Sequence, residues 1–380
     1  MKLTVGLIIL LLVSGFIVAR YDQINFKTSE ITADVEELVD EAYRGDDFRK
    51  VYEVIPLEFP RDHGPHPDYR AEWWYYTGNL ADTDGNRYGY QFTIFRRGIV
   101  PGEPERESEW ASRQIYFAHF TVTDVTGETF ENYERYSRAS AGLAGAQADP
   151  YHVWIDDWYA KEIAPGQVQL KANDGNIAID LILEPAKPPA LQGDRGLSAK
   201  SHEPGNASYY YSLTNNPTRG VVATRRGAFE VTGNSWEDRE WSTSDLPEGT
   251  VGWDWFSLQL DDQREVMFFY IRQKDGSALP GSSGLVVYPD GSTRYLEQAD
   301  VEITILDHWT SPKSGAVYPA GWNFKLPGEA IELHITPLLN DQELSGSFVY
   351  WEGAVRIEGA QTGYGYVEMT GYAGSMRGRL

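Results

Sequence analysis

The sequence predicts an all-β body made of two antiparallel β-barrel units in tandem, preceded by an N-terminal hydrophobic segment and one short helix. From Val51 onward, short runs of alternating apolar and polar residues are separated by Gly, Asp, Asn and Pro, a pattern typical of strands and turns. The second half of this body also repeats parts of the first half in the same order. Because closure removes exposed strand edges, two repeated units are most simply two barrels; a two-sheet sandwich is the alternative.

The composition excludes several classes of partner. The chain has 380 residues and a formal net charge of −23. Nucleic acids and anionic membrane surfaces are bound through basic patches, so we expect neither as a partner. Cysteine is absent, which excludes disulfides, a thiolate nucleophile and cysteine-ligated metal sites. We expect no cofactor.

The N-terminus carries an export segment. Lys2 precedes an apolar run, Leu3 to Ala19, whose length fits either a cleaved signal peptide or an uncleaved membrane anchor. Both alternatives place the body in the periplasm or elsewhere outside the cytoplasm, with membrane contact only through residues 3–19. Residues 20–50 are expected to form a linker with one helix, because apolar residues recur at helical spacing between Glu30 and Arg44.

Strands and hairpin turns are predicted at defined places in the body. Gly supplies the positive φ angle that tight turns need, and it occurs in three predicted turns, at 83–86, 173–176 and 289–292. The clearest predicted strands are Tyr88 to Arg96, Ile115 to Asp124, Val168 to Ala172, Ile177 to Leu183, Phe256 to Leu260, Val266 to Arg272 and Ile331 to Ile335.

Three weak internal matches define the repeat. Trp73 to Leu80 matches Trp253 to Leu260, and Ile179 to Pro185 matches Ile331 to Pro337. A third match joins Val231-Thr232-Gly233 to Ile357-Glu358-Gly359. Their common order predicts a first unit over residues 51–245 and a second over 246–380, divided in the polar segment SDLPEGT.

The stretch DHGPHPDYRAEWWYYTGNL, from Asp62 to Leu80, is the most unusual part of the chain. In an extended strand Glu72, Trp74 and Tyr76 share one face, and Trp73, Tyr75 and Thr77 share the other. Aromatic side chains on both faces favour a strand between a core and a ligand cavity, although a strand buried on both sides has the same pattern.

This stretch, together with YGYQFTIFRRG, VTGNSWEDREWS and GWDWFSLQLDDQREVMFFYIR, resembles the AttH-like family, which is related to carotenoid 1,2-hydratases. The resemblance covers about Tyr52 to Tyr372. It implies two lipocalin-like units, a lipophilic ligand and hydration of carbon–carbon double bonds. It also implies an envelope role beside an FtsX-like transporter permease.

Hydration of an unactivated alkene needs a positioned acid and a means of stabilising a carbocation. Burial raises the pKa of a carboxyl group, and aromatic faces stabilise cations. The run from Trp236 to Trp241 offers both, since Trp236, Asp238 and Glu240 share one face of a strand. Asp238 is the first candidate acid, Glu240 the second and Asp254, in the Trp-Asp-Trp sequence, the third. An ion-pair cluster around Arg239, with the tryptophans as core, is the alternative.

The candidate ligand-binding residues combine aromatic side chains with two histidines: Trp73, Trp74, Tyr76, Trp236, Trp241, Trp253, Trp255, His63 and His66. His63 and His66 lie in a proline-restricted loop without an H-E-x-x-H helix, so we predict a rigid loop at a barrel entrance and no metal site. His119 is expected to be a core or cavity histidine. No G-x-S-x-G elbow occurs, which argues against a serine hydrolase.

Two functions follow from these patterns, with a third left open. The first is an exported protein that binds a lipophilic small molecule and hydrates its double bond. The second is a carrier of a lipid or other hydrophobe that works with an FtsX-like transporter. The third is a scaffold in which side chains fill both barrels.

Overall fold

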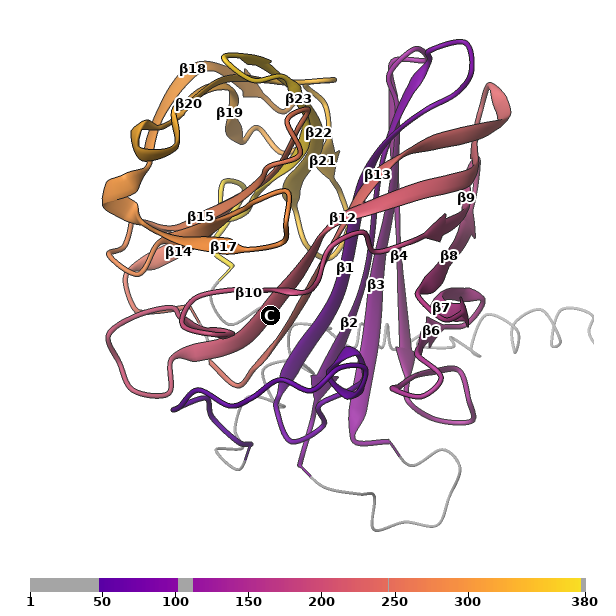
Figure 1. The fold of residues 1–380 in the computed structure, drawn as a ribbon. Helices are drawn as coiled ribbons and strands as arrows, with labels where there is room; N and C mark the ends of the chain where they lie inside the picture. The colour runs from indigo at the N-terminus through magenta and orange to yellow at the C-terminus, as the bar shows by residue number, and fades with distance from the viewer. Residues whose placement is uncertain (1–47, 102–111, 245, 377–380) are drawn as a thin grey trace, which may run out of the picture. The chain divides into compact units, whose positions relative to one another are not determined.

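The computed structural model describes residues 48–101, 112–244 and 246–376. This part is built almost entirely of antiparallel strands arranged in two curved sheets, one a nearly closed barrel and the other a half-barrel (Figure 1). The prediction of an all-β protein with two barrel units in tandem is therefore confirmed. Both sheets belong to one compact unit.

The first sheet contains thirteen strands in the order β4-β3-β2-β1-β13-β12-β9-β8-β7-β6-β5, with β10 and β11 paired to β12. Its strands are β1 (Ala71–Ala81), β2 (Arg87–Gly98), β3 (Gln114–Asp124), β4 (Thr129–Arg138), β5 (Ala144–Gln147), β6 (His152–Ile155), β7 (Trp158–Ala164), β8 (Gln167–Asp174), β9 (Ile177–Leu183), β10 (Ala190–Leu191), β11 (Leu197–Ala199), β12 (Ala207–Thr224) and β13 (Gly227–Ser242).

The second sheet contains ten strands in the order β17-β16-β15-β14-β23-β22-β20-β19-β18, with β21 paired to β22. Its strands are β14 (Thr250–Leu260), β15 (Glu265–Gln273), β16 (Ser283–Val287), β17 (Thr293–Glu297), β18 (Glu302–Thr310), β19 (Val317–Leu326), β20 (Ile331–Pro337), β21 (Glu343–Leu344), β22 (Tyr350–Gly359) and β23 (Gly363–Met369). Three short 3-10 helices complete the described elements: η1 (Arg61–His63), η2 (Gln298–Asp300) and η3 (Pro327–Glu329).

All seven predicted strands are present, and each of the three predicted turns joins two neighbouring strands. Gly85, Gly175 and Gly291 adopt positive φ angles in these turns, as the hairpin geometry requires. The predicted export segment and the helix between Glu30 and Arg44 lie outside the described residues. Among the described residues, no helix is long and apolar enough to cross a membrane.

The strand order reveals how the repeat is built. β1 lies between β2 and β13, and β14 lies between β15 and β23 in the same way. The matches of Trp73 to Leu80 with Trp253 to Leu260, and of β9 with β20, therefore join equivalent strands.

The third predicted match is wrong. Val231-Thr232-Gly233 lies on β13, but Ile357-Glu358-Gly359 lies on β22, which is the counterpart of β12. The register identifies the true partner of β13, since Gly233 pairs with Leu80 and Gly363 of β23 pairs with Leu260. Three residues of an alternating pattern fit any strand of a sheet, which explains the error.

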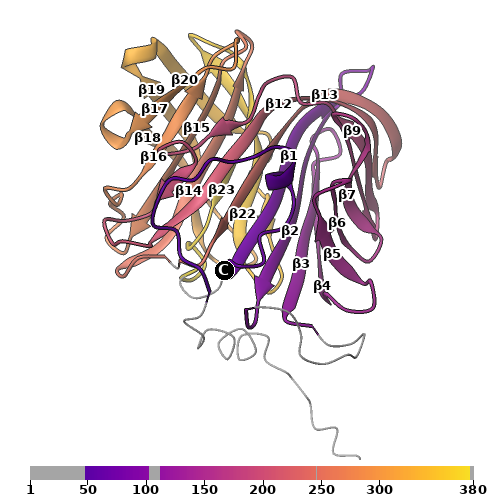
Figure 2. The same cartoon turned by 60° about the horizontal axis from the view of Figure 1, so that its bottom comes forward.

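The last strand of the first sheet ends at Ser242, and the first strand of the second sheet begins at Thr250. The two sheets pack against each other through β1, β2, β22 and β23 (Figure 2). A cluster of buried aromatic and aliphatic side chains joins them. Trp74 and Tyr76 of β1 point into the core of the first sheet, whereas Tyr75 and Trp73 belong to the cluster between the sheets. This is the alternation that the sequence predicts for an extended strand.

Candidate active site between the two sheets

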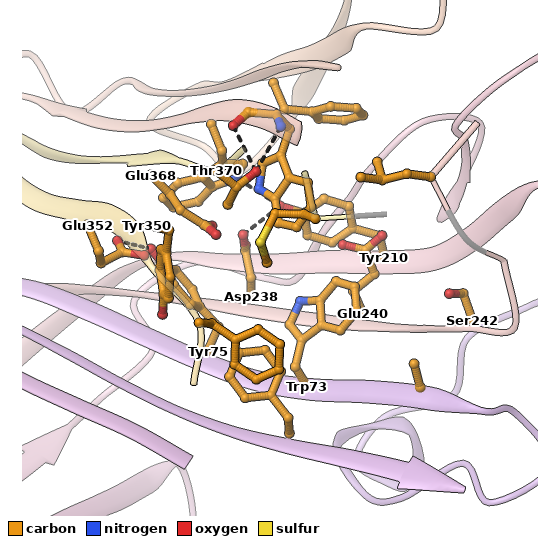
Figure 3. Close-up of a pocket in the computed structure, with 18 of the residues that line it drawn as sticks. Trp73, Tyr75, Tyr210, Asp238, Glu240, Ser242, Tyr350, Glu352, Glu368 and Thr370 are labelled. Atoms are coloured by element: carbon orange, nitrogen blue, oxygen red, sulfur yellow. Dashed lines mark hydrogen bonds between the residues drawn. The ribbon is translucent and has the colours of Figure 1, made fainter. Parts of the chain in front are cut away.

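A cavity of about 160 Å³ lies between the two sheets (Figure 3). Strands from both sheets form its wall: β1, β2, β3, β12 and β13 from the first, and β14, β15, β22 and β23 from the second. Aromatic and acidic side chains dominate the lining. The cavity therefore depends on the packing of the two units against each other, not on the interior of either barrel.

Equivalent aromatic residues of the two units form much of the wall. Trp73 and Tyr75 come from β1, and Trp253 and Trp255 come from the corresponding positions of β14. The rings of Tyr75 and Trp255 meet edge to face, with their centroids 5.2 Å apart. Such a wall suits an apolar ligand and can stabilise a positive charge that develops on it.

Asp238 of β13 points into this cavity and accepts three hydrogen bonds. Tyr210 Oη and Ser212 Oγ each donate to its carboxyl group at 2.5 Å, and Trp236 Nε1 donates at 2.7 Å. Burial raises the pKa of Asp238 to about 7, although the three donors favour the ionised form. Asp238 can therefore change its protonation state near neutral pH.

Glu352 of β22 and Glu368 of β23 face the same cavity and pair directly across the two strands. Burial, and then the charges of Glu368 and Asp238, raise the pKa of Glu352 well above its ordinary value. Tyr75 Oη donates to Glu352 Oε1 at 2.7 Å, while Glu352 Oε2 is buried without a hydrogen-bond partner. Protonated Glu352 can therefore direct an O–H group at a ligand.

The repeat relates Glu368 to Asp238. Asp238 pairs with Tyr75 on β1, and Glu368 pairs with Trp255 at the equivalent position of β14. Burial raises the pKa of Glu368 to about 8, and the charge of Asp238 contributes. Figure 3 shows the three carboxyl groups of Asp238, Glu352 and Glu368 around one part of the cavity.

Glu240 has a different environment. Lys200 Nζ lies 2.7 Å from its carboxylate, and Ser208 Oγ donates to the same oxygen at 2.5 Å. Lys200 also lies over the ring of Phe269, 4.6 Å from the ring centroid. Glu240 is therefore placed as the ion-pair partner of Lys200 at the cavity wall.

Asp254 does not face the cavity, although Trp253 and Trp255 on either side of it do. Its carboxylate accepts hydrogen bonds from Arg272, Tyr270 and Tyr372. The alternation of the strand turns it to the opposite face, where these partners enclose it. Asp254 is therefore placed as a structural ion pair, separate from the carboxyl groups of the cavity.

The other predicted site residues divide between the cavity and the interior of the first barrel. Trp236 supports Asp238 through its Nε1 atom, but Trp74 and Tyr76 lie in the barrel core and Trp241 lies in a neighbouring cluster. His63 Nδ1 is 2.6 Å from Tyr211 Oη. His66 forms a hydrogen bond with Glu72 and stacks on Trp241, with ring centroids 3.7 Å apart.

The two loop histidines therefore contact the first barrel and not the inter-sheet cavity. Within the described ranges, no group of three or more His, Asp or Glu side chains could hold a metal ion. His119, by contrast, lines the cavity and contacts Tyr350 through Nδ1 at 2.7 Å.

Sequence reasoning missed several cavity residues: Tyr75 as a ligand contact, Gln91, Lys200, Tyr210, Tyr350, Glu352 and Glu368. The repeat contained a signal for one of them. Had β13 been matched to β23, Asp238 would have pointed to Glu368 at the equivalent position. Glu352 has no such signal, because Ser212 occupies its equivalent position on β12.

The raised pKa of Glu368 gives a testable pH dependence of stability. Its pKa is about 8 in the folded protein and near the ordinary 4.5 when unfolded, so the folded state binds the extra proton between these values. The stabilisation that this proton gives the folded state is complete below the unfolded pKa and is lost as pH rises through about 8. We expect Glu368→Gln to have the same free energy of unfolding as the wild type at low pH. On going to pH 8 it should lose less of this free energy than the wild type does, as measured by urea unfolding. The exposed Glu332→Gln variant should keep the wild-type slope, and an unchanged slope in Glu368→Gln would contradict the assignment.

Two curved antiparallel sheets in tandem, with an acidic and aromatic cavity between them, define a lipocalin-like two-barrel protein. The chain belongs to the AttH-like family, whose model matches residues 50–372. The expected family resemblance is thus confirmed. No curated protein sequence matches the chain.

Solved structures share this fold, and the first of them also supports the family assignment. The structure of an AttH from Nitrosomonas europaea (NE1406) is 34% identical and has a TM-score of 0.77, covering 86% of this chain and 99% of its own. Kievitone hydratase from Nectria haematococca has the same fold at 15% identity, with a TM-score of 0.63 and coverage of 86% and 97%. CghA is 13% identical with a TM-score of 0.51, covering 88% of this chain and 97% of its own.

Proposed function

We propose that this protein hydrates a carbon–carbon double bond of a lipophilic small molecule bound between the two sheets. One observation carries the proposal. Glu352 is fully buried at the cavity wall, its first carboxyl oxygen is held by Tyr75, and its second oxygen has no partner. An acid kept protonated by burial is what protonation of an unactivated alkene requires at neutral pH.

The reaction can be written with the groups of the cavity. The proton on Glu352 Oε2 moves to one alkene carbon, and the π electrons form the new carbon–hydrogen bond. The rings of Trp73, Trp253 and Trp255 stabilise the resulting carbocation, by about 0.5 to 2 kcal/mol for each well-placed ring. Water adds to the cationic carbon and gives its proton to Asp238, the neighbour that three donors make easier to ionise. A return of this proton to Glu352 restores the site, so alkene and water are consumed and an alcohol forms.

The name of one structural relative agrees with this chemistry. Kievitone hydratase shares the two-barrel fold, and its name denotes addition of water. At 15% identity the likeness shows the fold alone, so the chemistry assigned to this chain rests on its own carboxyl groups.

A carrier function is the alternative, and the aromatic lining of the cavity favours it because an apolar wall binds a hydrophobe without an acid. In that case the body would shelter a lipid outside the cytoplasm and pass it to an FtsX-like transporter permease. The apolar run from Leu3 to Ala19 supports export in either case.

Incubation in water labelled with heavy oxygen separates the two functions. The purified protein is mixed with a lipid extract of its source cells, and the products are analysed by mass spectrometry. A hydratase gives species heavier by one labelled water molecule, whereas a carrier co-purifies with a lipid that remains chemically unchanged. Boiled protein is the control for spontaneous hydration. Retention of an unchanged lipid with no labelled product would contradict the hydratase proposal.

A further inference from the structure

Three buried polar atoms without hydrogen-bond partners belong to side chains that line the inter-sheet cavity. These side chains are Gln91 on β2, His119 on β3 and Glu352 on β22. Gln91 and Glu352 are fully buried, and His119 is 3% exposed. Buried polar groups in proteins are nearly always paired, so three unpaired atoms at one cavity wall indicate a missing partner.

The strand register places these side chains together. Tyr75, Thr93 and His119 form one row across β1, β2 and β3, and Gln91 lies two residues from Thr93 on the same face of β2. This row meets β22 of the other sheet through two contacts, Tyr75 Oη to Glu352 and His119 Nδ1 to Tyr350 Oη. The part of the cavity lined by Gln91, His119 and Glu352, called the recess below, is therefore assembled from both units.

We propose that Gln91 and His119, beside the acid Glu352, bind a hydroxyl group of an otherwise apolar and uncharged ligand. This inference deepens the proposed function by naming the ligand class, and it rests on the same cavity being the ligand site. It applies to a substrate and to a carried ligand alike.

The chemistry of the recess fits such a group. Gln91 Nε2 donates to Thr93 Oγ1 at 2.6 Å, so the amide oxygen, Oε1, is left as an unpaired acceptor. With Nδ1 accepting from Tyr350 Oη, neutral His119 offers Nε2–H as a donor, and the O–H group of Glu352 stays free for the double bond. A hydroxyl group can donate to Gln91 Oε1 and accept from His119 Nε2–H. A carbonyl oxygen cannot donate to Gln91, and a hydrocarbon would leave both atoms unpaired.

The surrounding charges argue against an anionic ligand. Asp238, Glu352 and Glu368 all face the cavity, and the lysine in its lining, Lys200, is already paired with Glu240. A carboxylate or phosphate group would therefore find no unpaired cation in the lining, and it would oppose the ionised forms of the acidic side chains that face it. Fatty acids and phosphorylated lipids are expected to bind weakly.

Binding of three saturated ligands with one carbon skeleton tests the proposal. We would measure the dissociation constants of menthane, menthol and menthone through the fluorescence of the cavity tryptophans. In Gln91→Leu we expect menthol to bind about tenfold more weakly. Menthone, which has no proton to donate to Gln91 Oε1, and menthane should bind as in the wild type. These ligands contain no double bond to hydrate, so failure of the hydration assay and failure of this test are distinguishable.

A second variant, at His119, tests whether an effect of Gln91→Leu could come from a loss of folding alone. His119→Asn keeps amide atoms near the position of Nδ1, so the contact with Tyr350 can persist while the group at Nε2 is withdrawn. It should weaken the binding of menthol, and of menthone, whose oxygen can accept from Nε2–H, but leave menthane binding unchanged. Gln361→Leu is the matched control, because Gln361 also has a buried, unpaired amide oxygen but lies in the turn between β22 and β23. Equal changes for menthol and menthane in both cavity variants would overturn the proposal and assign the recess to water alone.

Discussion

Replacement of Glu352 by glutamine should lower the rate of hydration by about 10²- to 10⁴-fold, which is the usual contribution of a positioned general acid. Glutamine keeps the shape of the side chain and can still accept the hydrogen bond of Tyr75 Oη, but it has no acidic proton. Substrate affinity should change little, since apolar contacts with the aromatic wall remain. Turnover of the labelled product and the dissociation constant of menthone measure the two effects separately.

The pH profile distinguishes an acid from a structural residue. The protonated form of Glu352 is active, and burial with two acidic neighbours raises its pKa well above the ordinary value. Activity should therefore rise as Asp238, the proton acceptor, ionises near pH 7, and fall again as alkaline pH removes the proton of Glu352. Glu343→Gln is the matched control, since Glu343 is a fully buried glutamate that contacts Ser311, Ser314 and Tyr318 away from the cavity. Full activity of Glu352→Gln would exclude Glu352 as the acid.

The periodicity of the sequence was sufficient to predict the all-β class and the faces of its strands. Alternation placed Trp73 and Tyr75 opposite Trp74 and Tyr76, and it placed Asp238 and Glu240 on one face, as the structure has them. A period of two residues is a local property, so it survives in any sheet arrangement.

The position of the cavity could not be predicted in this way. Alternation defines two faces of β1 but does not say which of them meets the second unit. Asp254 illustrates the limit, because its two tryptophan neighbours line the cavity while its own side chain turns away. Glu352 illustrates the converse, since it meets Tyr75 across 277 positions of the chain. Contacts of that kind follow from the packing of two sheets and leave no motif.

The histidine-containing loop before β1 is held by a buried ion-pair cluster centred on Glu72. Glu72 is fully buried and binds two arginines, with Arg96 Nε at 2.9 Å and Arg239 Nη2 at 2.8 Å. It also binds His66, through the backbone N–H at 2.9 Å and through Nδ1 at 2.7 Å. Although burial alone would raise the pKa of Glu72, the charges of Arg239 and His66 hold it well below the ordinary range. The sequence suggested an ion-pair cluster around Arg239 as the alternative to an acid site. That cluster exists on one face of β13, and the candidate acids Asp238 and Glu240 lie on the other face.

Replacement of Glu72 by glutamine should therefore destabilise the fold by about 3 to 5 kcal/mol, the usual cost of breaking a buried ion pair. Glutamine fills the same space but leaves the Arg96 and Arg239 guanidinium groups, both with fully buried side chains, without a negative partner. Urea unfolding at neutral pH measures the change in free energy. Glu358→Gln is the control, because the exposed pair of Glu358 with Arg356 should contribute less than about 1 kcal/mol. A loss for Glu72→Gln as small as that of the control would mean that water reaches the cluster and replaces the carboxylate.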